Sequence, residues 1–184
     1  HGQLAPFFCY LAVSKINRKQ IIRNMDKRLY LLDAYALIYR AHYAFFNRPM
    51  LNAAGLNTSP IFGFTRALLE ILKKEKPTHL AVAFDLGRVT FRTELYPEYK
   101  AHRDETPDDI RKATPVIKDI LRAMNIPILE VEGYEADDII GTIAHRAQQH
   151  GYTTYMVTPD KDYGQLVTDH IRMYKPKKGD NDIE

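Results

Sequence analysis

The 184-residue chain has one cysteine, no tryptophan and no long apolar run. A single cysteine, Cys9, excludes an intrachain disulfide and a zinc site built from cysteines, which fits a reducing compartment. The apolar stretch at residues 6–13 is less than half of the roughly twenty residues that a membrane-spanning helix needs. We therefore expect a cytoplasmic protein without a membrane segment.

The start of the chain does not resemble a secretory signal either. Its basic residues follow the apolar stretch, whereas a signal peptide places them before it. Met25 stands directly before a clear strand pattern, so we interpret residues 1–24 as an extension outside the fold. Their removal is expected to leave the melting temperature nearly unchanged. Residues 25–184 are long enough for one domain and too short for two ordinary ones.

The chain also lacks a strong charge of either sign. Its formal net charge is only +3, so any grip on nucleic acid must come from local clusters of Lys and Arg. The composition alone identifies no partner.

Short apolar runs alternate with amphipathic stretches from Leu29 onward. This pattern predicts an α/β fold with a mostly parallel central sheet flanked by helices. Strands are expected at residues 29–32, 80–84, 126–131, 153–157 and 171–175. Helices are expected at residues 34–46, after the cap Ser59 with Pro60 in first position, after the cap Thr106 with Pro107 in first position, and from about Glu135 to Gly151.

Acidic residues stand at or just beyond the ends of the predicted strands. They are Asp33, Asp85, Glu135, Asp137, Asp138, Asp160 and Asp162. Ligands of open α/β sheets bind beyond the carboxyl ends of the strands, so these side chains are expected to converge. Two carboxylates about 4 Å apart repel by about 1 kcal/mol in water and about 4 kcal/mol at an effective dielectric of 20. A converging cluster therefore needs cations.

Carboxylates without His or Cys at ligand spacing favour Mg²⁺ or Mn²⁺ over zinc, and a pair of such ions suits phosphodiester hydrolysis. The alternative for any single acid is structural, because an acid in a first helical turn interacts favourably with the helix dipole. We assign that role to Asp108 and Asp109. For the other seven acids, their joint placement favours a metal site.

Several short motifs occur in order between Leu29 and Tyr174. They are Leu31-Leu-Asp33 with Tyr39-Arg40, Gly63-Phe64, Ala83-Phe-Asp85, Phe91-Arg92, Tyr99-Lys-Ala-His-Arg103, Gly133-Tyr-Glu-Ala-Asp-Asp138 and Asp160-Lys-Asp162 with Gln165-Leu166. This set resembles the 5′-nuclease domain of bacterial DNA polymerase I, in the flap-endonuclease superfamily, whose fold is PIN-like. The resemblance implies a structure-specific 5′-3′ exonuclease and flap endonuclease. Its partners would be DNA with a 5′ flap or nick and RNA primer–DNA hybrids, in replication and repair.

The resemblance also implies roles for the acids. Asp33, Asp85, Glu135, Asp137 and Asp138 would supply a first metal site, and Asp160 and Asp162 would lean toward a second. In the family the second site takes further acids from a later segment, beside a helix-turn-helix-like element. That C-terminal helical part is missing here, so the second site is incomplete. We expect the chain alone to fold and bind metal but to cleave flaps weakly, and a covalently linked polymerase domain is implied.

Residues 88–111 mix basic and aromatic side chains. Such a mixture suits phosphate contact and base stacking, but it also occurs in ordinary solvated loops. In the related nucleases this region forms an arch over the active site. The resemblance implies that Lys100 and Arg103 steer the scissile phosphate and that Arg92 and Arg40 lie near the active site. Tyr96 and Tyr99 are candidates for contacting nucleic acid, and packing against the domain is the alternative for both.

Two other functions remain open. A PIN-class ribonuclease has a similar acid rim, but it ordinarily lacks the Tyr99–Arg103 block and cuts single-stranded RNA. A non-catalytic nucleic-acid-binding domain would bind equally well after chelation and after Asp85→Ala or Asp137→Ala. Comparing flap DNA with unstructured RNA separates the first alternative.

Overall fold

The computed structural model describes residues 26–87, 90–99, 105–176 and 182–183. The predicted extension at residues 1–24 lies outside the described residues, as do Lys100 and Arg103.

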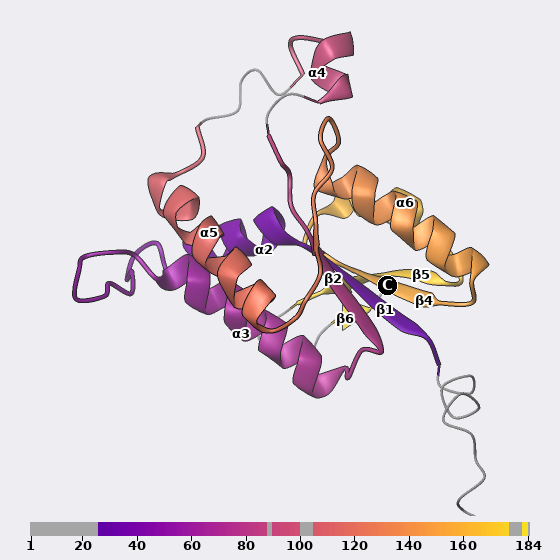
Figure 1. The fold of residues 1–184 in the computed structure, drawn as a ribbon, viewed down its shortest axis with the longest axis horizontal. Helices are drawn as coiled ribbons and strands as arrows, with labels where there is room; N and C mark the ends of the chain where they lie inside the picture. The colour runs from indigo at the N-terminus through magenta and orange to yellow at the C-terminus, as the bar shows by residue number, and fades with distance from the viewer. Residues whose placement is uncertain (1–25, 88–89, 100–104, 177–181, 184) are drawn as a thin grey trace, which may run out of the picture.

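A single sheet forms the centre of the fold (Figure 1). Its strands are β1 (Arg28–Asp33), β2 (His79–Ala83), β3 (Ile128–Leu129), β4 (Thr153–Val157), β5 (Ile171–Lys175) and β6 (Asp182–Ile183). They are arranged in the order β3-β2-β1-β4-β5-β6, and only the pairing of β5 with β6 is antiparallel. The predicted mostly parallel sheet is confirmed.

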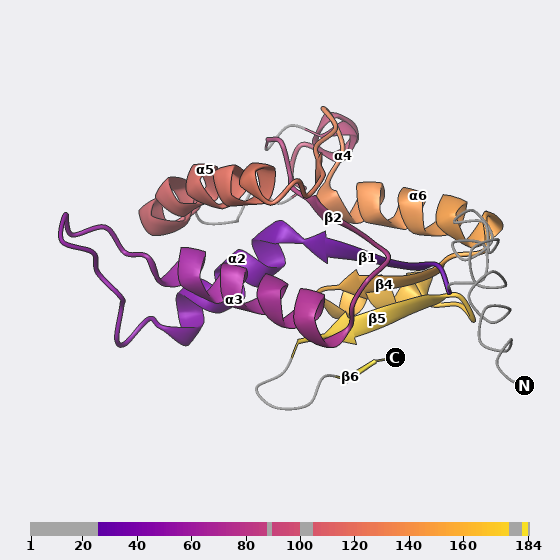
Figure 2. The ribbon, with the colours of Figure 1, turned by 60° about the horizontal axis from the view of Figure 1, so that its bottom comes forward.

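Helices cover both faces of this sheet. They are α2 (Ala34–Ala44), α3 (Ser59–Lys74), α4 (Phe91–Leu95), α5 (Asp108–Ala123), α6 (Ala136–Gln149) and the 3₁₀ turn η1 (Lys161–Leu166). Figure 1 shows α2, α3 and α5 on one side of the sheet and α6 on the other. Helix α4 stands away from the sheet in Figures 1 and 2. No helix among the described residues is long and apolar enough to cross a membrane.

Successive side chains of β1 point to opposite faces of the sheet, and they belong to two separate hydrophobic clusters. Tyr30 and Leu32 pack with buried residues of α2, α3 and α5, whereas Leu31 packs with the buried face of α6. In α3 the side chains of Phe64 and Leu68 are buried. Both faces of the central strand β1 are therefore buried, as expected for a parallel sheet between helices.

Several predicted boundaries were wrong. The third strand is only Ile128–Leu129, because these are the residues of that segment that pair with β2. The helix predicted for residues 34–46 ends at Ala44. The cap of α3 is Thr58 rather than Ser59, whose hydroxyl instead accepts a hydrogen bond from the Met50 N–H at 2.8 Å.

The start of α5 is also one residue later than predicted. Pro107 has an extended ψ of 141°, so the helix begins at Asp108. Asp108 and Asp109 then lie in its first turn, as the dipole interpretation requires. Helix α6 ends at Gln149 with His150 as its cap, and the next residue is Gly151, whose φ of 74° favours glycine.

Candidate active site

Asp33 and its neighbours reach one end of the sheet through the strand register. Asp33 pairs with Ala83 in β2, and Leu32 pairs with Val157 in β4, so Thr158 follows beside Asp33. From β1 the chain adds β2 and β3 on one side of the sheet and then β4 and β5 on the other, so the strand order reverses between β1 and β4. In open α/β sheets, ligands bind in the crevice at such a switch point. Asp33 therefore lies at the position where this fold binds ligands.

The Asp33 carboxylate is held from two sides. Its Oδ1 accepts a hydrogen bond from the Ala36 N–H at 3.1 Å and so caps α2. Its Oδ2 accepts from the Tyr163 hydroxyl at 3.1 Å and from the Thr158 hydroxyl at 3.4 Å. The pKa of Asp33 is raised to about 6, chiefly by burial; the hydrogen bonds from Ala36, Tyr163 and Thr158 oppose this shift, and the negative charge of Asp85 adds to it.

Asp85 connects the end of β2 to the start of α6. Its Oδ1 accepts a hydrogen bond of 2.6 Å from the N–H of Ala136, the first residue of that helix. Residues Ala81 and Ala83 pack toward α6, so alternation along the strand directs Asp85 to the same side. The sheet thus presents Asp33 and Asp85 together beside the start of α6.

The first turn of α6 carries the acids that follow Gly133. Glu135 is the cap residue, and it forms a capping box with Asp138, whose carboxylate accepts from the Glu135 N–H at 3.1 Å. Asp137 is half-buried, and burial raises its pKa, with a further contribution from the charges of Asp138 and Glu135. Capping accounts for Glu135 and Asp138, but it does not account for the half-buried carboxylate of Asp137.

Arg92 neutralises part of this charge. From α4 it donates two hydrogen bonds to Asp138, at 2.5 and 2.7 Å, and its guanidinium lies 3.9 Å from Glu135. The hydrogen bonds to Asp138 raise the pKa of Arg92 above its usual value. The Asp138 carboxylate is therefore engaged with Arg92 and the helix backbone, while Arg92 is close to the acids as expected.

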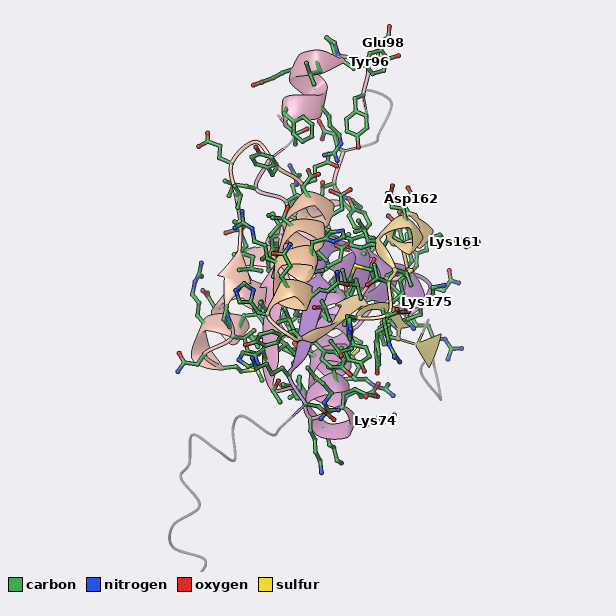
Figure 3. The ribbon with its side chains drawn as sticks, turned by 90° about the vertical axis from the view of Figure 1, so that its right-hand side faces the viewer. Lys74, Tyr96, Glu98, Lys161, Asp162 and Lys175 are labelled. Carbon is green, nitrogen blue, oxygen red and sulfur yellow. The ribbon has the colours of Figure 1, made fainter. Side chains whose placement is uncertain are left out.

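Asp160 and Asp162 follow β4. Asp160 caps η1 by accepting a hydrogen bond from the Asp162 N–H at 3.0 Å. Both side chains are exposed, and Figure 3 shows Asp162 at the outer edge of this turn. Asp160 lines the cavity described below, whereas Asp162 does not.

Five of the seven predicted acids line one cavity of about 640 Å³. They are Asp33, Asp85, Glu135, Asp137 and Asp160. The cavity is also lined by Tyr35, Tyr39, Tyr99 and Tyr163. The structure thus brings together side chains that are up to 127 positions apart in the printed sequence, counted from Asp33 to Asp160.

The chemistry of this cavity fits hydrated divalent cations. Its acids offer hard oxygen donors, and the described residues that line it include neither His nor Cys. Among the described residues no three His, Cys, Asp or Glu side chains form a ready-made metal cage. Mg²⁺ ordinarily keeps several of its waters and binds through one or two carboxylates, so a tight cage is not required. The raised pKa values of Asp33 and Asp137 also indicate negative charge that a cation would stabilise.

Of the other residues predicted to contact nucleic acid, Tyr99 lines the cavity, whereas Tyr96 and Arg40 do not. Tyr99 is half-buried, and its hydroxyl donates to Glu135 Oε2 at 3.3 Å, so it belongs to the cavity wall. Tyr96 is 57% exposed, and its hydroxyl donates to Glu98 at 2.7 Å (Figure 3). Arg40 is exposed on α2 and does not line the cavity.

Sequence reasoning missed Tyr163. It is 3% exposed and bonds to Asp33, 130 positions earlier in the chain. Burial raises its pKa above the usual value, followed by the charge of Asp33. The only signal in the sequence was its place directly after Asp160-Lys-Asp162, where an aromatic residue is readily interpreted as core.

The chain matches known proteins along most of its length. The profile of the family described as "5'-3' exonuclease, N-terminal resolvase-like domain" matches residues 28–184. DNA polymerase I of Bacillus caldotenax is 45% identical over 161 residues, which are 87% of this chain and 18% of that protein. DNA polymerase I of Chloroflexus aurantiacus is 47% identical over 145 residues, which are 79% of this chain and 15% of that protein. The chain spans less than a fifth of these relatives.

A solved structure shows the same fold. A bacteriophage T5 flap endonuclease, determined as a pseudo-enzyme-product complex with DNA and metal ions, aligns with a TM-score of 0.60 at 19% identity. The alignment covers 84% of this chain and 57% of that one. At this identity the likeness establishes the fold, and it confirms the predicted 5′-nuclease architecture.

Proposed function

This chain belongs to the family of the 5′-3′ exonuclease N-terminal resolvase-like domain, and from that premise we propose that it is a metal-dependent phosphodiester hydrolase. Its substrates would be DNA with a 5′ flap or nick and RNA primers paired with DNA. The observation that carries the proposal is the shared cavity of Asp33, Asp85, Glu135, Asp137 and Asp160.

We assign the acids to three roles. The five that line the cavity would hold divalent cations, for which we propose two Mg²⁺ or Mn²⁺ ions. Asp138 would orient the first turn of α6 through its bonds to Arg92 and to the backbone. Asp162 would stand at the edge of the second site, since it lies on the turn that Asp160 begins.

Divalent ions bound in such a site lower the pKa of a water and stabilise charge on the attacking and leaving oxygens of a phosphodiester. Hydrogen bonds within the chain hold the carboxylates that would bind these ions. Hydrogen bonds from Ala36, Thr158 and Tyr163 fix the Asp33 carboxylate. The N–H at the start of α6 fixes Asp85. No protein nucleophile is required.

The segment around α4 would bind the substrate. Arg92 donates to Asp138 and Tyr99 donates to Glu135. Both ends of the described stretch of this segment therefore contact the acidic first turn of α6. We propose that Lys100 and Arg103 continue it with positive charge for the scissile phosphate, and that Arg40 and Tyr96 contact nucleic acid. A linked polymerase domain and a cytoplasmic location also stay part of this proposal.

The proposal is tested by cleavage of 5′-flap DNA at high enzyme concentration. We expect slow cleavage that needs Mg²⁺ and stops with EDTA. Asp85→Asn and Asp137→Asn should each lower the rate on the order of 100-fold or more, because ion-derived charge stabilisation is worth several kcal/mol. Asp119→Asn, an exposed acid paired with Arg122 on α5, serves as the control.

Other results would contradict the proposal. Cleavage of unstructured RNA in preference to flap DNA would identify a ribonuclease. Binding of flap DNA that is unchanged by EDTA and by Asp85→Asn, without any cleavage, would identify a non-catalytic binding domain.

A further inference from the structure

Tyr163 connects two parts of the cavity rim that are far apart in the chain. Its ring is buried, and its hydroxyl donates to Asp33 Oδ2 at 3.1 Å. Asp33 ends β1, whereas Tyr163 belongs to η1, the turn that Asp160 caps. A single hydroxyl therefore links the turn that carries Asp160 to the carboxylate of Asp33.

Thr158 makes a second connection between the same parts. Its buried hydroxyl accepts a hydrogen bond from the Asp160 N–H at 3.2 Å and donates to Asp33 Oδ2 at 3.4 Å. The other oxygen, Oδ1, is held by the Ala36 N–H. The Asp33 carboxylate is thus fixed in one orientation, and its orientation is coupled to the position of the Asp160 backbone.

We propose that Tyr163 is a positioning residue, which with Thr158 sets the orientation of Asp33 relative to Asp160 for divalent-cation binding. This inference rests on the proposed function. A phenol suits the task because it stays a donor near neutral pH. Oδ2 accepts from Tyr163 and Thr158, whereas Oδ1 accepts the hydrogen bond from the Ala36 N–H and keeps a second lone pair for a cation. A residue that only filled the core would need the ring and not the hydroxyl.

Tyr163→Phe makes this distinction, because it keeps the ring and removes only the hydroxyl. The measurement is Mn²⁺ binding to the full 184-residue chain by isothermal titration calorimetry. A hydrogen bond to a charged group contributes enough that its loss should raise the dissociation constant about tenfold. Thr158→Val removes the longer hydrogen bond and should raise it by a smaller factor.

Tyr174→Phe is the matched control. Tyr174 is also almost fully buried, and its hydroxyl also bonds to a carboxylate, that of Glu75 at 3.3 Å. Glu75 does not line the acidic cavity. The same chemical change at Tyr174 should therefore leave the Mn²⁺ dissociation constant within about twofold of the wild-type value, which is small against the tenfold effect expected at Tyr163.

The outcomes separate this inference from the proposed function. If the wild-type chain binds Mn²⁺ and Tyr163→Phe binds it equally well, the positioning role is overturned and the proposed function stands. If Tyr174→Phe weakens binding as much as Tyr163→Phe, the effect is a general loss of stability and the positioning role is again overturned. If the wild-type chain shows no saturable Mn²⁺ binding, the proposed function fails and the inference fails with it.

Discussion

Arg92 donates two hydrogen bonds to Asp138, at 2.5 and 2.7 Å, across 46 positions of the chain. The pair joins α4 to the first turn of α6, where Glu135 and Asp137 add further negative charge. In the same region the Phe91 N–H donates to the Gly133 carbonyl at 3.0 Å. The segment that carries α4 is thus attached to the acids by both charge and backbone.

Arg92→Gln should destabilise the metal-free protein by about 1–2 kcal/mol, because a bidentate, charge-assisted pair is lost and the acids of α6 lose their counter-charge. Urea unfolding in EDTA measures this cost. Saturating Mg²⁺ should reduce it, since the ion supplies positive charge to the same cavity. Arg122→Gln, which breaks an exposed pair with Asp119 within α5, should cost less than about 0.5 kcal/mol. Equal costs for the two variants would show that the Arg92 pair has no special role.

Asp33 should make the metal-free protein less stable as the pH rises. Its pKa in the folded chain, about 6, lies above its ordinary value of 3.8. The folded state therefore binds the proton more tightly, and the free energy of unfolding falls between about pH 4 and pH 6 and is level above. Asp33→Asn removes this charge, so its advantage over the wild type should grow from near zero at pH 4 to as much as about 3 kcal/mol at pH 7.

The comparison is made by urea unfolding of both proteins in EDTA. Asp119→Asn provides the control, because its difference from the wild type should stay level over this range. A difference between Asp33→Asn and the wild type that does not change with pH would contradict the raised pKa that burial gives to Asp33.

Gly63→Ala should destabilise the contact between α2 and α3. A Cβ at Gly63 would lie 2.5 Å from the Cβ of Ala41, which real Cβ atoms do not tolerate. The cost of overpacking, about 1–3 kcal/mol, exceeds the gain of up to about 1 kcal/mol in helix propensity. Thermal unfolding measures the net loss. Gly87→Ala, where the new Cβ meets nothing within 4 Å, should change stability little; a stabilised Gly63→Ala variant would contradict the close packing.

Lys100→Ala should weaken the binding of flap DNA uniformly and lower the slope of log K against log salt concentration by about 1, as expected for the loss of one phosphate contact. Fluorescence anisotropy in an Asp85→Asn background measures binding without cleavage. Lys74→Ala is the control, since Figure 3 places Lys74 at the end of the molecule opposite to Tyr96. An equal change of slope for Lys74→Ala would show that the effect is general charge rather than the segment around α4.

The helices and strands were predictable where the hydrophobic pattern extends over several residues. The strands β1, β2, β4 and β5 coincide with stretches of the sequence in which apolar residues recur. Helix α6 has acidic residues at its start and Gly151 after its end. The five-residue helix α4 was not predicted, because it is too short to show a period and its start is fixed by local hydrogen bonds between the Thr93 hydroxyl and the Thr90 backbone. Short elements depend on local hydrogen bonds that hydrophobic patterns do not reveal.

The candidate site was predictable in part for the same reason. Acids at strand ends converge because parallel strands share one carboxyl edge, and that rule places Asp33, Asp85 and Asp160 in one cavity. No such rule gives the direction of an exposed turn, so the position of Asp162 outside the cavity was not foreseen. Tyr163 was missed because a hydrogen bond across 130 positions depends on the register of β1 with β4.

The most direct test of the shared acidic cavity is a crystal structure of the chain soaked with Mn²⁺, located by its anomalous scattering. We expect at least one peak within about 2.0–2.5 Å of carboxylate oxygens of Asp33, Asp85 or Asp137. Manganese peaks only elsewhere on the surface, with this cavity holding none at saturating Mn²⁺, would contradict it.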